Sequence, residues 1–240
     1  MTPLVMVHGF MGGSDQWDQQ SELKNKREVV CVDLPGFGSN AHMLARETIS
    51  GFATWVLEEL ERQSVQRFDL LGHSMGGMVV QDMVRQASKR VDRLILYGTG
   101  AVGVLPGRFE TIETSIKRAA QDGAAATARR ISATWFLEQE KASGYPACAT
   151  IAEQSTPASI EAGLRAMQGW TGEAHLKDIA SKTLVVWGAH DRTYPWSQTE
   201  LLWRIIPNSD LAVVPNCSHA VHAERPKLFN LMVDEFLSGS

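Results

Sequence analysis

The sequence predicts an α/β fold built on a mostly parallel central sheet, and two features of the chain support this. Short runs of consecutive aliphatic and β-branched residues recur, and each ends at a small or turn-forming residue. Between the runs lie stretches with apolar residues every three or four positions, which is the spacing of one helical face. Apolar runs without polar alternation are typical of parallel strands covered on both faces, so we expect right-handed β-α-β connections.

Six of the apolar runs are candidate strands, because each is short and bounded by turn residues. A helix is expected between the second and third runs, where Phe52, Val56 and Leu60 share one face. The strands and helices alternate along the chain, so helices should flank the sheet. The candidate strands cover residues 4–7, 29–32, 68–71, 94–97, 184–187 and 211–214.

One long stretch interrupts this alternation. Between residues 101 and 181 there is no convincing strand, and Ile112, Ile116 and Ala119 follow helical spacing. An insertion of this length between two strands usually carries function. We therefore expect a core formed by residues 1–100 and 182–240, with residues 101–181 forming a helical cap over the site. A separate helical bundle at the edge of the sheet is the alternative.

Composition and charge limit the function classes. The 240-residue chain has 27 acidic and 23 basic residues, and the basic ones are scattered, unlike the basic patch of a nucleic-acid-binding protein. No apolar stretch approaches the roughly 20 residues that span a bilayer, and no secretory signal is visible. The odd number of cysteines, without CxxC spacing, indicates free thiols. We expect a cytoplasmic protein without a nucleic-acid or membrane partner, and the oligomeric state is left open.

The clearest chemical signal is the G-x-S-x-G pattern at residues 72–76, which has Ser74 at its centre. It lies between the strand expected at 68–71 and a helix expected from Met75 onward. A serine on such a tight strand-to-helix turn is lifted out of the sheet, and the helix N-terminus adds positive charge where an oxyanion develops. Ser74 is therefore the candidate nucleophile. The alternative is a serine that caps the helix in a glycine-rich turn.

With this context, the sequence G-H-S-M-G-G at residues 72–77 resembles the nucleophile turn of the α/β-hydrolase superfamily, in its small capped form. The resemblance runs through nearly the whole chain. It implies an acid after a later strand and a histidine after the last one, and Asp191 and His219 occupy these positions. A Glu-x-Pro that begins at Glu224 fits the family pattern and favours His219 over His222. For Asp191 the alternative is a turn aspartate that caps the next helix.

The resemblance also implies the role of each residue. His219 would take the Ser74 proton and later return it, while Asp191 would hold the imidazole in the right tautomer. The backbone N–H groups of Phe10 and Met75 would bind the oxyanion.

Other polar residues near these positions are expected to be structural. His8 should orient the loop after the first strand, and Asp33 should hold a turn. The side chains of His73 and His190 should point away, because neighbouring side chains along a chain diverge.

The chain also departs from the family pattern. The family's sheet usually begins with two further strands before the His-Gly strand, whereas here the first strand follows Met1 almost directly. These two strands are expected to be absent, which leaves about six. No metal or other cofactor is expected, because neither an H-E-x-x-H zinc pattern nor a nucleotide-binding glycine pattern is present.

The substrate would be selected by the cap, where aromatic residues suggest an apolar pocket. Arg129-Arg130 is a candidate for binding a substrate carboxylate, with a solvated helix face as the alternative. Together these features predict a serine hydrolase that cleaves small carboxylic esters or lactones. The alternatives are hydrolysis of a carbon–carbon bond in vinylogous diketones and a ligand receptor with the same fold. The candidate pocket residues are Leu105, Trp135, Phe136, Met167 and Trp170.

Overall fold

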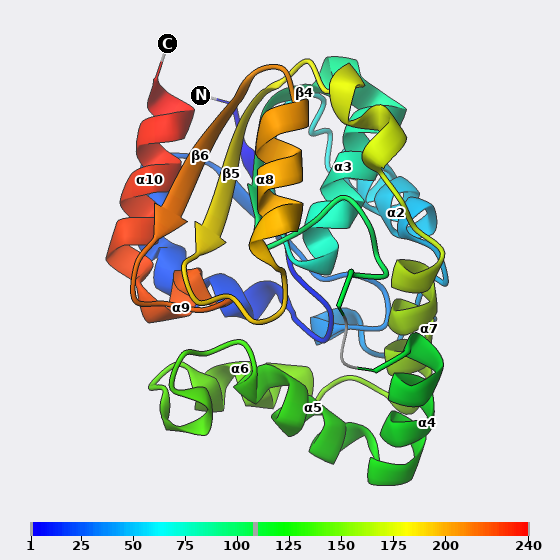
Figure 1. The fold of residues 1–240 in the computed structure, drawn as a ribbon. Helices are drawn as coiled ribbons and strands as arrows, with labels where there is room; N and C mark the ends of the chain where they lie inside the picture. Colours follow the sequence, from blue (N-terminus) through cyan, green and yellow to red (C-terminus); the bar gives the residue numbers. More distant parts are fainter. Residues whose placement is uncertain (1, 108–109, 240) are drawn as a thin grey trace.

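The computed structural model describes residues 2–107 and 110–239. Within these ranges six parallel strands form one sheet in the order β2-β1-β3-β4-β5-β6, with helices on both faces (Figure 1). The predicted α/β class with a parallel sheet is therefore confirmed. The strands are β1 (Leu4–Val7), β2 (Val29–Val32), β3 (Phe68–His73), β4 (Val91–Tyr97), β5 (Lys182–Gly188) and β6 (Ser209–Val214).

Four strands extend beyond the apolar runs that predict them. β4 begins before its apolar run and includes Asp92 and Arg93, and β6 begins with Ser209 and Asp210. The ladder of a parallel sheet is made by backbone groups, so polar side chains are tolerated where a strand leaves the covered part of the sheet. Hydrophobic runs therefore mark only part of these four strands.

The uniformly apolar sequence of β1 follows from its burial on both faces. Val5 and Val7 pack in the core that contains α2, α3 and α8. Leu4 and Met6 point to the opposite face and pack with residues of α1 and α10. Successive side chains of a strand alternate between faces, so a central strand needs apolar residues at every position. The helices of the core are α1 (Ser21–Lys26), α2 (Ile49–Arg62), α3 (Met75–Ala87), α8 (Trp196–Ile205), α9 (Val221–Glu224) and α10 (Pro226–Ser238).

The strand order sets the place of the site. From β1 the chain moves outward to β2 and then crosses back past β1 to β3. Open α/β sheets bind ligands at the carboxyl ends of the strands beside such a reversal, which here are the ends of β1 and β3. Ser74 directly follows β3, and Phe10 lies in the loop after β1.

The part of the chain that connects β4 to β5 forms a layer of helices, and this layer lies across the carboxyl ends of the strands (Figure 1). Local signals define its helices. The Thr111 hydroxyl caps α4, Gly123 ends α4 with a φ of 82°, and Thr156 with Ser159 forms a capping box on α7. We call this layer the cap. Its helices are α4 (Ile112–Asp122), α5 (Ala124–Ala133), α6 (Tyr145–Ala152) and α7 (Pro157–Gln168).

Candidate active site

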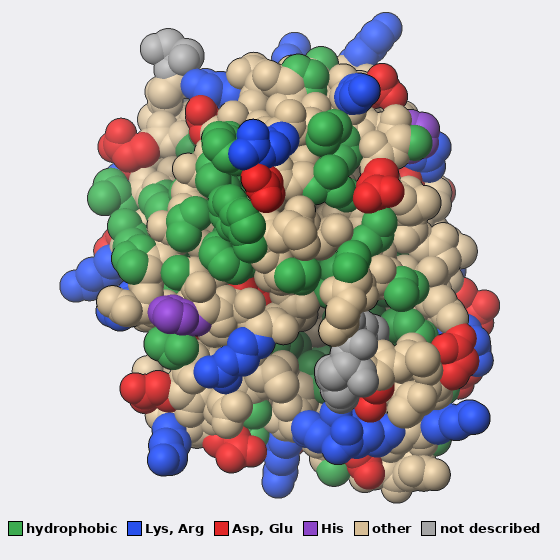
Figure 2. Space-filling model, viewed as in Figure 1, with side chains coloured by type: hydrophobic (Ala, Val, Ile, Leu, Met, Phe, Trp, Pro, Cys, Tyr) green, Lys and Arg blue, Asp and Glu red, His purple; other side chains and the backbone are tan. Residues whose placement is uncertain are grey.

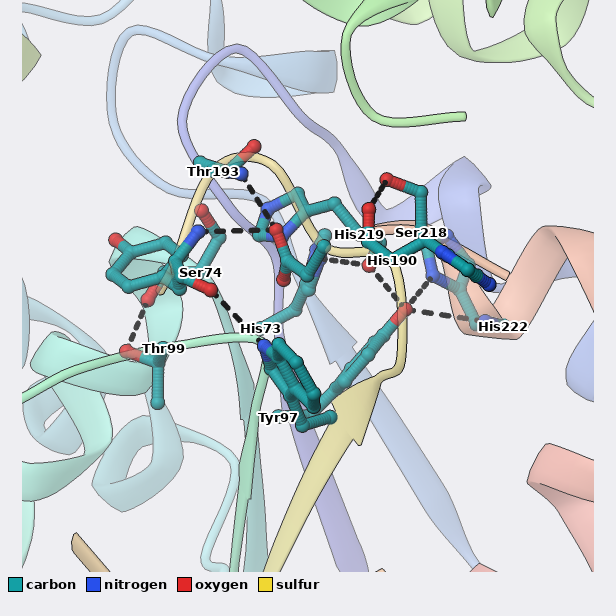
Figure 3. Close-up of polar contacts among 12 residues, drawn as sticks. His73, Ser74, Tyr97, Thr99, His190, Thr193, Ser218, His219 and His222 are labelled. Carbon is teal, nitrogen blue, oxygen red and sulfur yellow. Dashed lines mark hydrogen bonds and ion pairs between the residues drawn. The ribbon is translucent and has the colours of Figure 1, made fainter. Parts of the chain in front are cut away.

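Ser74 occupies a strained turn between β3 and α3. Its φ of 57° and ψ of −122° lie in a region that non-glycine residues rarely adopt, which costs of order 1–3 kcal/mol. Hydrogen bonds hold the turn: the Ser74 N–H donates to the Tyr97 carbonyl at 3.0 Å, and the Thr99 hydroxyl donates to the Ser74 carbonyl at 2.8 Å (Figure 3). The backbone N–H and carbonyl of Ser74 are thus engaged, and Ser74 lines the cavity described below.

The structure pairs the two other candidate catalytic residues. His219 Nδ1 lies 2.9 Å from Asp191 Oδ2, and both side chains are buried. The other carboxylate oxygen of Asp191 accepts the backbone N–H groups of Thr193 at 2.7 Å and Tyr194 at 3.0 Å. Because the carboxylate accepts at Nδ1, the neutral ring carries its proton there and Nε2 is free to accept one.

His219 Nε2 is buried and has no hydrogen-bond partner among the described residues. The His219–Asp191 pair must reach across the end of β4, since β4 lies between β3 and β5. Gly98, which directly follows β4, makes room for this. A Cβ at Gly98 would lie 3.1 Å from His219 Nδ1 and 3.5 Å from Asp191 Oδ2. The His219–Asp191 pair therefore packs against the backbone at the end of β4, the strand between β3 and β5.

The two expected oxyanion donors come from adjacent elements. Met75 is the first residue of α3, so its N–H has no acceptor within the helix. Phe10 follows β1, the strand next to β3, and its N–H makes no hydrogen bond to a described residue. Both N–H groups thus lie near the carboxyl ends of β1 and β3, where Ser74 also lies, and are available to bind an oxyanion. Their role as an oxyanion hole remains a prediction.

A group of buried aromatic rings lies beneath His219. The Tyr97 hydroxyl donates to the His219 carbonyl at 2.7 Å and lies 3.0 Å from His222 Nδ1 (Figure 3). Burial raises the pKa of Tyr97 well above its usual range, so the hydroxyl keeps its proton. That proton serves the His219 carbonyl, and the His222 Nδ1–H is assigned as the donor to the Tyr97 oxygen. Sequence reasoning overlooked Tyr97 because a tyrosine at the end of an apolar strand looks like core.

His73 does not point away from the site as expected. Its ring centroid lies 4.5 Å from that of His219, and its Nε2 is 3.3 Å from the His219 carbonyl oxygen. Burial lowers the pKa of His73 well below its usual range, and the neighbouring histidines lower it further. His73 and Ser74 do diverge locally, but the loop that carries His219 folds over the end of the sheet onto His73. The side chain of His190, in contrast, is exposed.

His222, the alternative to His219, lies away from Asp191 and against Tyr97 and Trp17. Burial, together with repulsion from His219, lowers the pKa of His222 to about 3. The ring is therefore neutral near pH 7. The geometry thus places His219, and not His222, beside the candidate acid.

Glu224 ties the loop of His219 to the cap. One carboxylate oxygen accepts the Ser218 N–H at 2.6 Å, and the other accepts the Leu137 N–H at 2.7 Å. Charge-assisted hydrogen bonds of this kind are stronger than neutral ones. The Glu-x-Pro pattern was the sequence signal for this residue, but only the structure shows what its carboxylate binds.

His8 and Asp33 hold the loops at the edge of the site. Burial lowers the pKa of His8, and the neutral ring joins two loops, with Nδ1 2.7 Å from the Gly9 oxygen and Nε2 accepting the Leu34 N–H at 3.0 Å. Asp33 accepts the Ser14 N–H at 2.7 Å and the hydroxyls of Ser14 and Ser39. Both residues make structural contacts of the kind expected from the sequence.

A cavity of about 530 Å³ lies between the core and the cap, with Ser74 and Asp191 in its wall. Figure 2 shows a hollow between the two parts of the molecule. Of the expected pocket residues, Leu105, Trp135 and Met167 line this cavity.

Two expected pocket residues lie elsewhere. Phe136 is fully buried in a small cluster with Cys148 and Ala220, away from the cavity. Trp170 lines a second hollow between α3 and the segment that follows α7. Adjacent aromatic residues such as Trp135 and Phe136 point in different directions, so only one of the two faces the cavity. The sequence pattern offers no way to choose between them.

No group of three His, Cys, Asp or Glu side chains in residues 2–107 and 110–239 lies close enough to hold a metal ion. Within the same residues, no helix is long and apolar enough to cross a membrane. Cys31, Cys148 and Cys217 are free thiols.

The geometry agrees with comparisons to known proteins. A sequence model described as "Alpha/beta hydrolase family" matches residues 4–230, and the chain belongs to this family. The solved enol-lactonase of Burkholderia xenovorans LB400 superposes with a TM-score of 0.89 at 21% identity, over 99% of this chain and 91% of that one. At this identity the likeness shows the fold alone.

Curated relatives differ in activity. The chain is 27% identical to a pimeloyl-[acyl-carrier protein] methyl ester esterase of Aromatoleum aromaticum, over 98% of both chains. It is 28% identical to a 2-hydroxy-6-oxo-2,4-heptadienoate hydrolase of Pseudomonas putida, over 98% of this chain and 89% of the relative. It is 29% identical to a dihydrolipoyllysine-residue acetyltransferase component of an acetoin cleaving system of Pseudomonas putida, but 98% of this chain spans only 63% of that relative. The comparisons thus support a hydrolase and leave its substrate open.

Proposed function

We propose that this protein hydrolyses carboxylic esters or lactones through an acyl-enzyme formed on Ser74. The main support is the pairing of His219 Nδ1 with Asp191 Oδ2 at 2.9 Å, together with the position of Asp191 and Ser74 in the wall of one cavity, where Ser74 occupies a strained strand-to-helix turn. A serine hydroxyl is a weak nucleophile at neutral pH, so it needs a base that is oriented by a third group. In this proposal His219 is the base and Asp191 is the group that orients it.

In the acylation step, Ser74 Oγ attacks the ester carbonyl carbon while His219 Nε2 takes the hydroxyl proton. The tetrahedral intermediate then expels the alkoxide, which leaves with the proton from His219. Asp191 keeps the ring oriented and stabilises the transient imidazolium. The buried, neutral His73 and His222 add no positive charge beside this imidazolium.

In the deacylation step, water attacks the acyl-enzyme while His219 again accepts a proton. The bond between the acyl carbon and Ser74 Oγ then breaks, the acid is released, and His219 returns the proton to Ser74 Oγ. In both steps a negative charge develops on the former carbonyl oxygen, where the N–H groups of Phe10 and Met75 would donate. One such donor contributes about 3–4 kcal/mol to transition-state stabilisation.

Hydrolysis of a carbon–carbon bond in a vinylogous diketone is the second candidate. It is favoured by the 28% identity to the 2-hydroxy-6-oxo-2,4-heptadienoate hydrolase. The same serine and histidine can serve either reaction, so the reaction depends on which substrate the cavity binds. A ligand receptor is the third candidate, and it would have a pocket without serine-dependent turnover.

The test is the initial rate of hydrolysis of p-nitrophenyl esters of increasing chain length, several lactones and a dienone acid. Wild type is compared with Ser74→Ala, which should lose a factor of roughly 10⁴ to 10⁶ while its circular dichroism is unchanged. Serine-dependent turnover of esters or lactones supports the proposal, and turnover of the dienone alone supports the second candidate.

A fluorophosphonate probe adds a readout that needs no substrate. We expect it to label wild type at Ser74, as located by peptide mapping, and to leave Ser74→Ala unlabelled. A wild-type protein that neither reacts with the probe nor turns over any compound would contradict the proposed function and favour the receptor.

A further inference from the structure

The two adjacent arginines of α5 have different surroundings. Arg129 is largely exposed and forms an ion pair with Glu153. Arg130 lines the cavity that contains Ser74, and its side chain is 30% exposed. Successive residues of a helix point about 100° apart, so the fold directs Arg130 inward and Arg129 to the surface. The structure thus separates two residues that the sequence left equivalent.

The guanidinium of Arg130 is only weakly engaged by the protein. It makes no hydrogen bond to a described residue, and its Nη2 lies 3.7 Å from Asp122 Oδ2, beyond hydrogen-bond distance. Asp122 is shared with Arg118, whose Nε is closer to the same oxygen, at 3.4 Å. A guanidinium has five N–H donors; the Nε–H of Arg130 is buried without a partner among the described residues, so the donors left for another acceptor are those of the two Nη groups.

The acidic groups of the cavity wall are more fully engaged. Asp191 binds His219 and two backbone N–H groups. Glu110 accepts the Ser115 hydroxyl at 2.7 Å and lies 3.8 Å from Arg118. A second guanidinium, that of Arg192, also lines the cavity; its Nη2 donates to the Leu137 carbonyl at 3.3 Å. The acidic side chains of the wall, Glu110 and Asp191, thus have closer polar contacts than the Arg130 guanidinium.

Arg130 and Ser74 enter the cavity from different parts of the molecule. Ser74 lies at the carboxyl edge of the sheet, and Arg130 lies on α5 in the cap. Apolar side chains of Leu105, Trp135 and Met167 belong to the same wall. A ligand that fills this cavity would place its reacting carbonyl near Ser74, an apolar chain along these residues and an anionic end near Arg130.

We propose that Arg130 binds a free carboxylate of the substrate, so that the preferred substrates are esters or lactones that carry a second, ionised carboxyl group. Arginine suits this role because its planar guanidinium can donate two parallel hydrogen bonds to a carboxylate. The inference rests on the proposed function for the hydrolytic step, whereas the carboxylate site itself can be tested by binding alone.

The kinetic test compares monomethyl with dimethyl esters of dicarboxylic acids from succinic to suberic acid. The two series share chain length and scissile bond and differ in the free carboxylate. Wild type should have the higher kcat/KM for the monoester, after correction for the second ester group of the diester. Arg130→Gln should lower kcat/KM for the monoester by roughly ten- to hundredfold, the range for one charge-assisted interaction, with little change for the diester.

Arg129→Gln is the matched control, because it removes the same charge from the neighbouring, surface-facing position of α5. It should keep the wild-type preference. The diester rate shows whether Arg130→Gln has folded, and Arg130→Lys, which keeps the charge, should retain part of the preference. Equal loss in both glutamine variants, or a wild type that prefers the diester throughout the series, would overturn the proposal.

Binding to Ser74→Ala, which cannot form the acyl-enzyme, separates this proposal from the proposed function. Calorimetry should show tighter binding of the monoester than of the diester, and Ser74→Ala/Arg130→Gln should lose that difference. If the difference persists without Arg130, the carboxylate site is wrong even where esters are hydrolysed. If it depends on Arg130 while wild type hydrolyses no ester, the carboxylate site stands and the esterase proposal fails.

Discussion

At the scale of single residues, the Asp191 carboxylate determines which ring nitrogen of His219 carries the proton. One oxygen accepts two backbone N–H groups, which fixes the carboxylate, and the other faces His219 Nδ1. A histidine so oriented has its unprotonated nitrogen at Nε2. The acid therefore need not take part in proton transfer to be essential.

Asp191→Asn should lower kcat by about 10⁴-fold, because an amide that donates to Nδ1 would stabilise the wrong tautomer of His219. The measurement is ester hydrolysis under single-turnover conditions, with the fluorophosphonate reaction as a second readout of Ser74 reactivity. The thermal midpoint of unfolding controls for folding. Activity within tenfold of wild type would mean that another acid orients His219.

Tyr97 and Glu224 act at the same scale but on the backbone around His219. The first holds its carbonyl, and the second holds the N–H of the residue before it. Neither touches a reacting atom in the proposed mechanism, so both are positioning residues. The loop of His219 is thus held by Tyr97 at the end of β4 and by Glu224 of α9, which also binds Leu137 of the cap.

At the scale of elements, the end of β4 decides how closely the His219–Asp191 pair can approach the sheet. Gly98 has a φ of 51°, and its missing side chain leaves space for the imidazole. Gly123, between α4 and α5, has a φ of 82°, and a Cβ added there would meet no atom within 4 Å. Both glycines have a positive φ, but only Gly98 has other side chains close to the position of an added Cβ.

Gly98→Ala should therefore reduce both stability and activity, whereas Gly123→Ala should reduce stability alone. A positive φ costs an alanine about 1–3 kcal/mol in each variant. Only the new methyl group at position 98 also crowds His219, at 3.1 Å from Nδ1. Denaturant unfolding and kcat measured side by side check this, and equal kcat values for the two variants would be against it.

At the scale of the whole molecule, burial of neutral histidines couples stability to pH. The pKa of His222 is lowered to about 3 in the folded protein, while an unfolded histidine titrates near 6.5. Above about pH 6.5 both states are neutral and the residue adds no pH dependence. As the pH falls from about 6.5 toward 3, the unfolded state binds the proton first, so stability decreases.

His222→Asn should make the free energy of unfolding less sensitive to pH between about 6 and 4, by close to one bound proton. Asparagine keeps a group near Nδ1 that can bond to Tyr97 but does not titrate. The comparison is of slopes from urea unfolding at several pH values, since the variant also loses packing. His190→Asn, at an exposed position, is the control, and an unchanged slope in His222→Asn would contradict the buried neutral state.

Much of the fold was readable from the sequence because its signals are local. Apolar runs indicate the six strands, the G-x-S-x-G turn indicates Ser74, and the resemblance to the α/β-hydrolase superfamily implies Asp191 and His219 after later strands. Parallel strands end at one edge of the sheet, so residues that follow them must come near one another. This geometric rule relates positions that are distant in the sequence.

The fold class, the approximate positions of the strands and the candidate nucleophile Ser74 follow from the amino-acid sequence, because hydrophobic patterns and turns act over a few residues. The positions of Asp191 and His219 follow from the resemblance to the α/β-hydrolase superfamily. The packing of the elements, in contrast, makes Trp135 and not Phe136 face the cavity, turns Arg130 and not Arg129 inward, and brings His73 under His219. Neighbouring residues have nearly the same local signals. Which of them faces a cavity depends on how whole elements pack, and that packing is set by contacts between distant parts of the chain.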